Sequence, residues 1–197
     1  MAERVLAAVL AAGQARRFGG GKLDAPCAGR RLGGWALRAV EQVGPEQAGV
    51  EAVIIVPSQV PRFAAESGWP LIVNRAAERG LGTSLACAAQ TAAGRGATHL
   101  LVLLADMPLV DAALLKRLLA SPAPAAVEHG LGRPGVPALL PACTFGKLTQ
   151  LDGDRGAAAL LQAMPDLCLV AASPGALLDV DDVEALQRAA SMLQDHH

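Results

Sequence analysis

The chain has 197 residues and a formal net charge of −1, with 52% hydrophobic and 3% aromatic residues. This length is typical of one domain with a substantial buried core, and we expect a single domain over 1–197 with its core at about 4–194. A net charge this close to zero argues against a general nucleic-acid or anionic-membrane surface. No apolar stretch is long enough to span a bilayer.

The four cysteines, Cys27, Cys87, Cys143 and Cys168, are scattered without a Cys-x-x-Cys pair. This spacing supports neither structural zinc nor a disulfide framework, so we expect reduced, mostly buried thiols in a cytoplasmic protein. The apolar run 5–12 is too short for a signal peptide and leads directly into basic residues. The pair His196–His197 is compatible with a native end or a tag.

Compact apolar runs alternate with helical patterns along the chain. In the first half we expect strands at 5–12, 52–56, 71–73 and 100–105, and helices at 35–43, 61–67 and 84–93. In the second half we expect helices at 112–119, 157–164 and 183–193, strands near 125–127, 138–140 and 167–171, and loops at 122–124 and 130–137. Continuous apolar strands alternating with helices predict an α/β fold, a mostly parallel sheet with helices on both faces.

A glycine-rich loop follows the first expected strand. Residues 10–22 read Leu-Ala-Ala-Gly-Gln-Ala-Arg-Arg-Phe-Gly-Gly-Gly-Lys, so the strand breaks at Gly13 and the loop contains Arg17 and ends at Lys22. Glycine lets backbone N–H groups approach an anion closely, and two cations beside them neutralise phosphate charge. The pattern favours a loop that holds a triphosphate. The plainer alternative is a flexible loop with solvated arginines.

Two familiar phosphate-binding motifs are absent from this loop. A Walker A motif ending at Lys22 needs glycine at position 16 and serine or threonine at position 23, where the chain has Arg16 and Leu23. A Gly-x-Gly-x-x-Gly fingerprint beginning at Gly13 is broken by Ala15. A nicotinamide oxidoreductase is therefore a remote alternative.

A carboxylate follows the apolar run 100–105, in the sequence Asp106-Met107-Pro108. Ligands of open α/β sheets bind beyond the carboxyl ends of the strands, which is where Asp106 is expected to lie. Magnesium uses one or two carboxylates and completes its shell with phosphate oxygens and water. Asp106 is thus a candidate metal ligand, or else a turn-forming aspartate before a proline.

The glycine-rich loop closely resembles the signature Leu-Ala-Ala-Gly-x-x-x-Arg-[Met/Phe]-Gly-x-x-Lys of the MobA-like nucleotidyltransferases, and of molybdenum cofactor cytidylyltransferases in particular. Similar motifs extend from residue 5 to about 186. The resemblance implies a Rossmann-like nucleotidyltransferase fold, with Arg17, Lys22 and Asp106 as catalytic residues and Asp106 as a metal ligand. It implies nucleotide contacts from Leu10, Ala11, Ala12, Gly13, Arg17, Lys22, Asn74, Gly82, Thr83, Ser84 and Asp106.

The segment 177–184, Leu-Leu-Asp-Val-Asp-Asp-Val-Glu, resembles the family's closing motif Asp-[Ile/Val]-Asp-Thr-Pro-Glu-Asp. Asp179 and Asp181 match its first and third positions, and the resemblance makes Asp181 the second metal ligand. Asp182, Val183 and Ala185 depart from the motif. The alternative is that Asp182 caps the last helix while the two preceding aspartates are solvated.

Two further regions resemble the family's base-selecting and acceptor-side loops. The stretch 74–85 matches Asn-x(5)-Gly-[Met/Leu]-x-x-Ser-Leu, and together with Leu-Ala-Ala-Gly it implies CTP rather than GTP; alternatively, Thr83 or Ser84 is an ordinary helix N-cap. The acceptor-side loops are 130–137 and 151–157. The resemblance implies that their acceptor-binding residues are Arg133, Gly135, Asp154 and Gly156. Arg133 and Arg155 are also compatible with plain solvation. Relatives often read Gly-His-Pro where this chain has Gly135-Val136-Pro137, which leaves the acceptor open.

The resemblance implies a Mg²⁺-dependent transfer of CMP from CTP to the terminal phosphate of the molybdenum cofactor, molybdenum-bound molybdopterin, with release of pyrophosphate. Mn²⁺ is an alternative ion, and a molybdoenzyme apoprotein is a candidate partner. Two other hypotheses are retained: a relative that uses GTP or another phosphorylated acceptor, and a non-catalytic carrier of the molybdenum cofactor. A carrier has no need of a triphosphate site.

Overall fold

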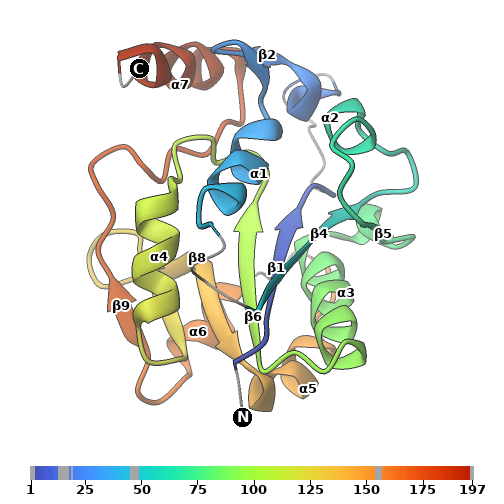
Figure 1. The fold of residues 1–197 in the computed structure, drawn as a ribbon, viewed down its shortest axis with the longest axis vertical. Coiled ribbons are helices and arrows are strands. Elements are labelled where there is room, and N and C mark those ends of the chain that lie inside the picture. The colour runs from blue at the N-terminus through green and yellow to red at the C-terminus, as the bar shows by residue number, and fades with distance from the viewer. Residues whose placement is uncertain (1–2, 13–17, 19, 45–48, 154–156, 196–197) are drawn as a thin grey trace.

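The computed structural model describes residues 3–12, 18, 20–44, 49–153 and 157–195. These form a seven-stranded sheet in the order β5-β4-β1-β6-β8-β7-β9 (Figure 1). Four of the six neighbouring pairs are parallel, and β8 runs antiparallel to both of its neighbours. The strands are β1 (Val5–Leu10), β4 (Val50–Val56), β5 (Leu71–Val73), β6 (His99–Leu104), β7 (Ala125–Glu128), β8 (Pro134–Pro141) and β9 (Cys168–Val170). The predicted mostly parallel α/β sheet is confirmed.

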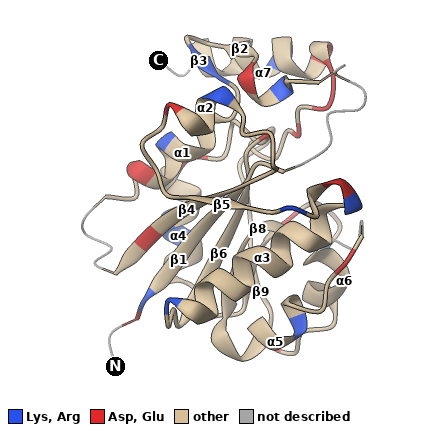
Figure 2. Ribbon diagram, turned by 90° about the vertical axis from the view of Figure 1, so that its right-hand side faces the viewer, with Lys and Arg blue, Asp and Glu red and all other residues tan. Residues whose placement is uncertain are grey.

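Helices cover both faces of the sheet, as predicted (Figures 1 and 2). One face packs against α1 (Gly34–Glu41) and α4 (Ala112–Ala120), with α7 (Val183–Asp195) joining the same cluster. The other face packs against α3 (Leu81–Gly94), α5 (Phe145–Leu148) and α6 (Ala157–Gln162). Alternate residues of β1 enter the two clusters, which explains why this strand is a continuous apolar run.

Short elements lie beyond the carboxyl edge of the sheet. They are η1 (Lys22–Asp24), the hairpin β2 (Pro26–Cys27) and β3 (Arg30–Arg31), and α2 (Arg62–Ala65); η2 (Ala77–Arg79) follows β5, and η3 (Ala142–Thr144) follows β8. The register pairs Leu10 of β1 with Ile55 of β4 and Leu104 of β6. These three strands therefore end at the same level, and the loops that follow them share one end of the molecule.

Three local predictions were wrong. The stretch 130–137 is not wholly a loop, because β8 begins at Pro134. Neither Thr83 nor Ser84 caps α3, which begins earlier, at Leu81, with Gly80 in the capping position. The thiols are less buried than expected: Cys27 is buried, Cys143 is exposed, and the other two are intermediate.

Two aspartates start helices by capping them. Asp111 accepts a hydrogen bond from the backbone N–H of Leu114 at the start of α4 (2.8 Å). Asp182 accepts one from the backbone N–H of Ala185 at the start of α7 (2.7 Å), as predicted. Within the described residues, every helix is too short or too polar to cross a membrane.

Candidate functional site

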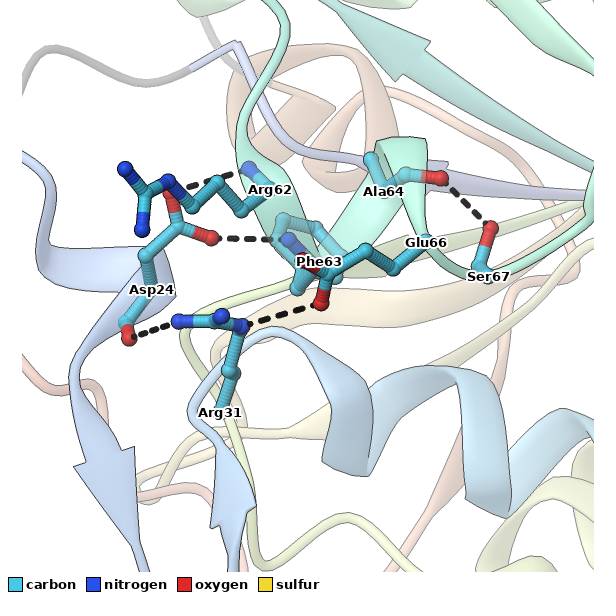
Figure 3. A network of polar contacts seen from close by, with 7 residues as sticks. All are labelled: Asp24, Arg31, Arg62, Phe63, Ala64, Glu66 and Ser67. Atoms are coloured by element: carbon cyan, nitrogen blue, oxygen red, sulfur yellow. Dashed lines mark hydrogen bonds and ion pairs between the residues drawn. The ribbon is translucent and has the colours of Figure 1, made fainter.

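Lys22 is held at the carboxyl edge by the short helix that it begins. Two residues later, the carboxylate of Asp24 accepts hydrogen bonds from the backbone N–H groups of Arg62 (2.9 Å) and Phe63 (2.8 Å), at the start of α2 (Figure 3). Arg31 donates to the backbone carbonyl of Asp24 (3.2 Å) and pairs with Glu66 (3.3 Å). The segment that follows Lys22 is therefore fixed to the loop after β4.

The ammonium of Lys22 lies between two carboxylates. Its Nζ is 2.9 Å from Oδ2 of Asp106 and 3.0 Å from Oδ1 of Asp181, and the lysine side chain is only 6% exposed. Asp106 is mostly buried and Asp181 is exposed. Burial alone lowers the pKa of Lys22, but the nearby aspartates outweigh burial and raise that pKa above its ordinary value. Lys22 is thus firmly protonated.

Asp106 is placed by the end of β6, as the sequence predicts. The backbone N–H of Ala105 donates to the carbonyl of Leu10 (3.0 Å), so the chain leaves the sheet at Asp106. The carbonyl of Asp106 then accepts a hydrogen bond from the backbone N–H of Val180 (3.0 Å). This bond ties the segment before α7 to the end of β6 and brings Asp179 and Asp181 beside Asp106.

Three carboxylates gather at this point. Asp106, Asp179 and Asp181 each offer an oxygen, and these oxygens all lie within 4.8 Å of one another. Partial burial, followed by the charges of Asp106 and Asp181, raises the pKa of Asp179 to about 7. The three acids carry more potential negative charge than the single ammonium of Lys22 neutralises.

The donor set of this cluster fits a hard divalent cation. All three groups are carboxylates, and oxygen donors are those that Mg²⁺ and Mn²⁺ prefer. The cluster includes both predicted metal ligands, Asp106 and Asp181, and adds Asp179. Because Asp179 and Asp181 are two positions apart in an extended segment, their side chains are expected on the same side, and this alternation was the signal available in the sequence.

The predicted nucleotide-binding residues of the first loop are only partly described. Leu10, Ala11 and Ala12 are buried at the end of β1, and the N–H of Ala11 donates to the carbonyl of Ile55 (2.8 Å). Gly13 and Arg17 lie outside the described residues. Their assignment to the nucleotide stays a prediction.

The second predicted nucleotide-binding segment contains a buried polar cluster, which we call the Asn74 cluster: Asn74, Thr83 and Ser84. The amide nitrogen of Asn74 donates to the hydroxyl oxygens of Thr83 (2.9 Å) and Ser84 (3.1 Å), and its Oδ1 accepts from the N–H of Ala76 (3.0 Å). The hydroxyl of Thr83 in turn lies 3.0 Å and 2.8 Å from the carbonyl oxygens of Ala76 and Gly80. These side chains hold the loop to the start of α3.

Gly82, also predicted to bind nucleotide, is engaged at the start of α3. Its backbone N–H donates to the carbonyl of Gly153 (2.8 Å), which joins the helix to the loop after α5. Arg79 and Asp152 form an ion pair across the same junction. The structure therefore brings the predicted base-selecting loop and the second acceptor-side loop together.

The predicted acceptor-side residues fall into two groups. Arg133 is exposed in the turn between β7 and β8, and Gly135 lies in β8. A Cβ at Gly135 would come within 2.5 Å of the ring of His129, whose Nε2 lies 2.7 Å from the carbonyl oxygen of Val136. The absence of a side chain at Gly135 therefore has a packing reason. Asp154 and Gly156, like Arg155, lie outside the described residues.

Comparisons with known proteins identify the family of this chain. A family model described as the MobA-like NTP transferase domain matches residues 7–167. The chain is 33% identical over 190 residues to the purine catabolism protein PucB of Bacillus subtilis (strain 168), covering 89% of this chain and 90% of that protein.

Solved structures with a similar fold are also found. Rv0371c from Mycobacterium tuberculosis H37Rv is similar at 27% identity with a TM-score of 0.80, over 97% of this chain and 99% of that one. A complex of Rv0371c with manganese is similar at 25% identity and a TM-score of 0.75, over 95% and 98% of the two chains. Since the family model and PucB each match most of its length, the chain belongs to the MobA-like NTP transferase family.

Proposed function

We propose that this chain is a divalent-metal-dependent cytidylyltransferase that transfers CMP from CTP to the terminal phosphate of molybdenum-bound molybdopterin and releases pyrophosphate. The observation that carries the metal-dependent transfer is the cluster of three carboxylates around buried Lys22, at the carboxyl edge of the sheet. The resemblance of Leu10–Gly13 and Gly82–Leu85 to cytidylyltransferase motifs supports CTP. The acceptor is supported by family resemblance.

Charge neutralisation and positioning are the main tasks of the proposed site. Asp106, Asp179 and Asp181 hold the divalent cation, which supplies positive charge to the triphosphate. Lys22 and Arg17 offset the remaining charge on the triphosphate and on the departing pyrophosphate. Backbone amides after Gly13 receive phosphate oxygens. The Asn74 cluster fixes the loop that faces the base.

The reaction itself needs little acid–base chemistry from the protein. An oxygen of the acceptor's phosphate monoester attacks the α-phosphorus of CTP in line, a new P–O bond forms, and the bond to the β-phosphate oxygen breaks with departure of pyrophosphate. A phosphate monoester with a second pKa of about 6 is largely dianionic at neutral pH, so no general base is required. Arg133, Gly135, Asp154 and Gly156 are the proposed acceptor-side positions.

The test is release of pyrophosphate from CTP and from GTP, each with Mg²⁺ or Mn²⁺ and with molybdenum cofactor as acceptor. We expect release that depends on CTP, on the metal and on the acceptor together. Release with GTP alone would keep the reaction and overturn the base. A chain that binds CTP and is silent with this acceptor would indicate another phosphorylated acceptor, and tight cofactor binding without CTP binding would indicate a carrier.

A control variant separates the loss of a carboxylate in the site from a general effect of losing one negative charge. Asp166 is exposed in the turn before β9 with φ of 59°, a left-handed conformation that asparagine also tolerates. Asp166→Asn removes the same charge as a substitution in the acidic cluster without touching the site. We expect this variant to release pyrophosphate at the rate of the unmodified protein.

A further inference from the structure

Lys22 contacts two of the carboxylates that a cation would use. Its Nζ contacts Oδ2 of Asp106 and Oδ1 of Asp181, two of the three carboxylates that form the acidic cluster. A divalent cation ligated by the same carboxylates would lie close to the ammonium, and the two positive charges would repel each other. Lys22 and the metal therefore compete for one set of ligands.

Lys22 also ends the glycine-rich loop, which the proposed function assigns to the triphosphate. Gly20 and Gly21 precede it with φ of 100° and 66°, and added side chains there would meet open space. Lysine carries its charge on a flexible four-carbon chain. A triphosphate bound beside Gly20 and Gly21 would lie next to Lys22 in the chain and would offer its ammonium another anionic partner.

We propose that Lys22 is the resident counter-ion of the three carboxylates and gives way to the divalent cation only when a nucleoside triphosphate offers its ammonium another partner. This rests on the proposed function only in requiring that the chain bind a triphosphate. The consequence is that the metal binds weakly by itself and tightly together with the nucleotide. The empty site is thereby kept from taking up free cations.

The first experiment measures Mn²⁺ binding by electron paramagnetic resonance of the free ion, without nucleotide. In Lys22→Met, we expect Mn²⁺ to bind at least about tenfold more tightly than in the unmodified protein, because a competing positive charge is gone. Lys147→Met, at an exposed position of α5, is the matched control and should leave the affinity unchanged. Equal or weaker binding in Lys22→Met would overturn the counter-ion role.

Should Lys22→Met fail to fold, as judged by circular dichroism, Lys22→Gln replaces it. Glutamine donates hydrogen bonds to the same oxygens without charge, so the expected gain in Mn²⁺ affinity has the same sign. Neither measurement depends on turnover. A chain without transferase activity still reports whether Lys22 competes with the metal.

The second experiment follows the ammonium itself in the unmodified protein. The chain has three lysines, Lys22, Lys116 and Lys147, so lysine labelled with ¹⁵N at Nζ gives a spectrum simple enough to assign with the variants. We expect the Lys22 signal to stay in place with Mg²⁺ alone and to shift when Mg²⁺ and α,β-methylene-CTP, which is not cleaved, are added together. An equal shift with millimolar Mg²⁺ alone, or no shift on confirmed binding of the analogue, would overturn the exchange. If no nucleotide binds, the proposed function and the exchange fail together while the first experiment stands.

Discussion

Two polar clusters lie beside the same sheet, and they differ in whether their polar groups are satisfied within the chain. In the Asn74 cluster, a neutral amide and two hydroxyls satisfy one another and the neighbouring backbone, and all three side chains are buried. In the acidic cluster, three carboxylates face one ammonium. The first cluster is complete within the chain, whereas the second has charge left over for a ligand. Unbalanced charge therefore distinguishes the candidate site from a cluster with a structural role better than burial does.

The sharpest way to test this difference is Asp106→Asn. The amide oxygen still accepts a hydrogen bond from Lys22, and Asp181 remains as its ion-pair partner, so the fold should persist. Loss of the carboxylate should reduce pyrophosphate release by at least about 10²-fold, as removal of one preorganised electrostatic group does in other enzymes. Steady-state rates with saturating metal measure the effect, and the circular dichroism melt is the control. Undiminished metal-dependent turnover would remove Asp106 from the site.

The opposite behaviour is expected from Asn74→Ala. The substitution leaves the hydroxyls of Thr83 and Ser84 without their donor in a buried setting, which should lower the free energy of unfolding by about 1–3 kcal/mol. Urea unfolding measures this loss. Affinity for Mn²⁺ should not change, because the acidic cluster is untouched. A variant with unchanged stability would show that the Asn74 cluster does not stabilise the fold.

The contrast also shows how far the sequence alone can predict the site. Asp106 was predictable because an apolar strand ending in an aspartate has a defined place in an α/β sheet. The pairing of Lys22 with Asp181 joins residues 159 positions apart, and neither local pattern nor spacing specifies such a contact. Asp179 matched the closing motif but was not assigned to the metal, because the resemblance gives that role to the third position; the Asp106–Val180 hydrogen bond shows that the segment also brings Asp179 beside Asp106.

The beginning of the antiparallel strand β8 was predicted wrongly for a similar reason, although strands near 125–127 and 138–140 were predicted. Glycines and prolines over 130–137 predict a loop, yet β8 begins at Pro134. The ladder with β6 starts only at Ala138, and the pairing with β7 shifts between Ala126 and Val127. Pro137 therefore lies where its missing N–H costs no regular ladder bond. Such an irregularity is set by tertiary pairing and leaves no periodic signal.

A smaller effect is expected from Asp182→Ala, at the junction between the acidic cluster and α7. The variant loses the hydrogen bond from the N–H of Ala185 to the Asp182 carboxylate, and loss of an N-cap of this kind costs about 1 kcal/mol. Thermal unfolding should show the decrease, and Asp182→Asn, which can still cap, should recover most of it. Because Asp182 is not among the three clustered carboxylates, Mn²⁺ affinity should stay close to that of the unmodified chain. A large loss of Mn²⁺ affinity would instead make Asp182 part of the site.

The smallest effect is expected from Asp179→Asn, which should raise the free energy of unfolding in the absence of metal, whereas Asn74→Ala and Asp182→Ala should lower it. Asp179 adds negative charge beside Asp106 and Asp181, and those neighbours disfavour its ionised form. In protein treated with a chelator, the neutral amide should therefore raise the free energy of unfolding, by less than about 1 kcal/mol because the side chain is solvent-accessible. With Mn²⁺ present the sign should reverse, since the carboxylate then stabilises the bound cation. Paired unfolding curves with and without Mn²⁺ measure both signs. A variant less stable under both conditions would mean that Asp179 supports the fold rather than the cation, and the acidic cluster would then resemble the Asn74 cluster after all.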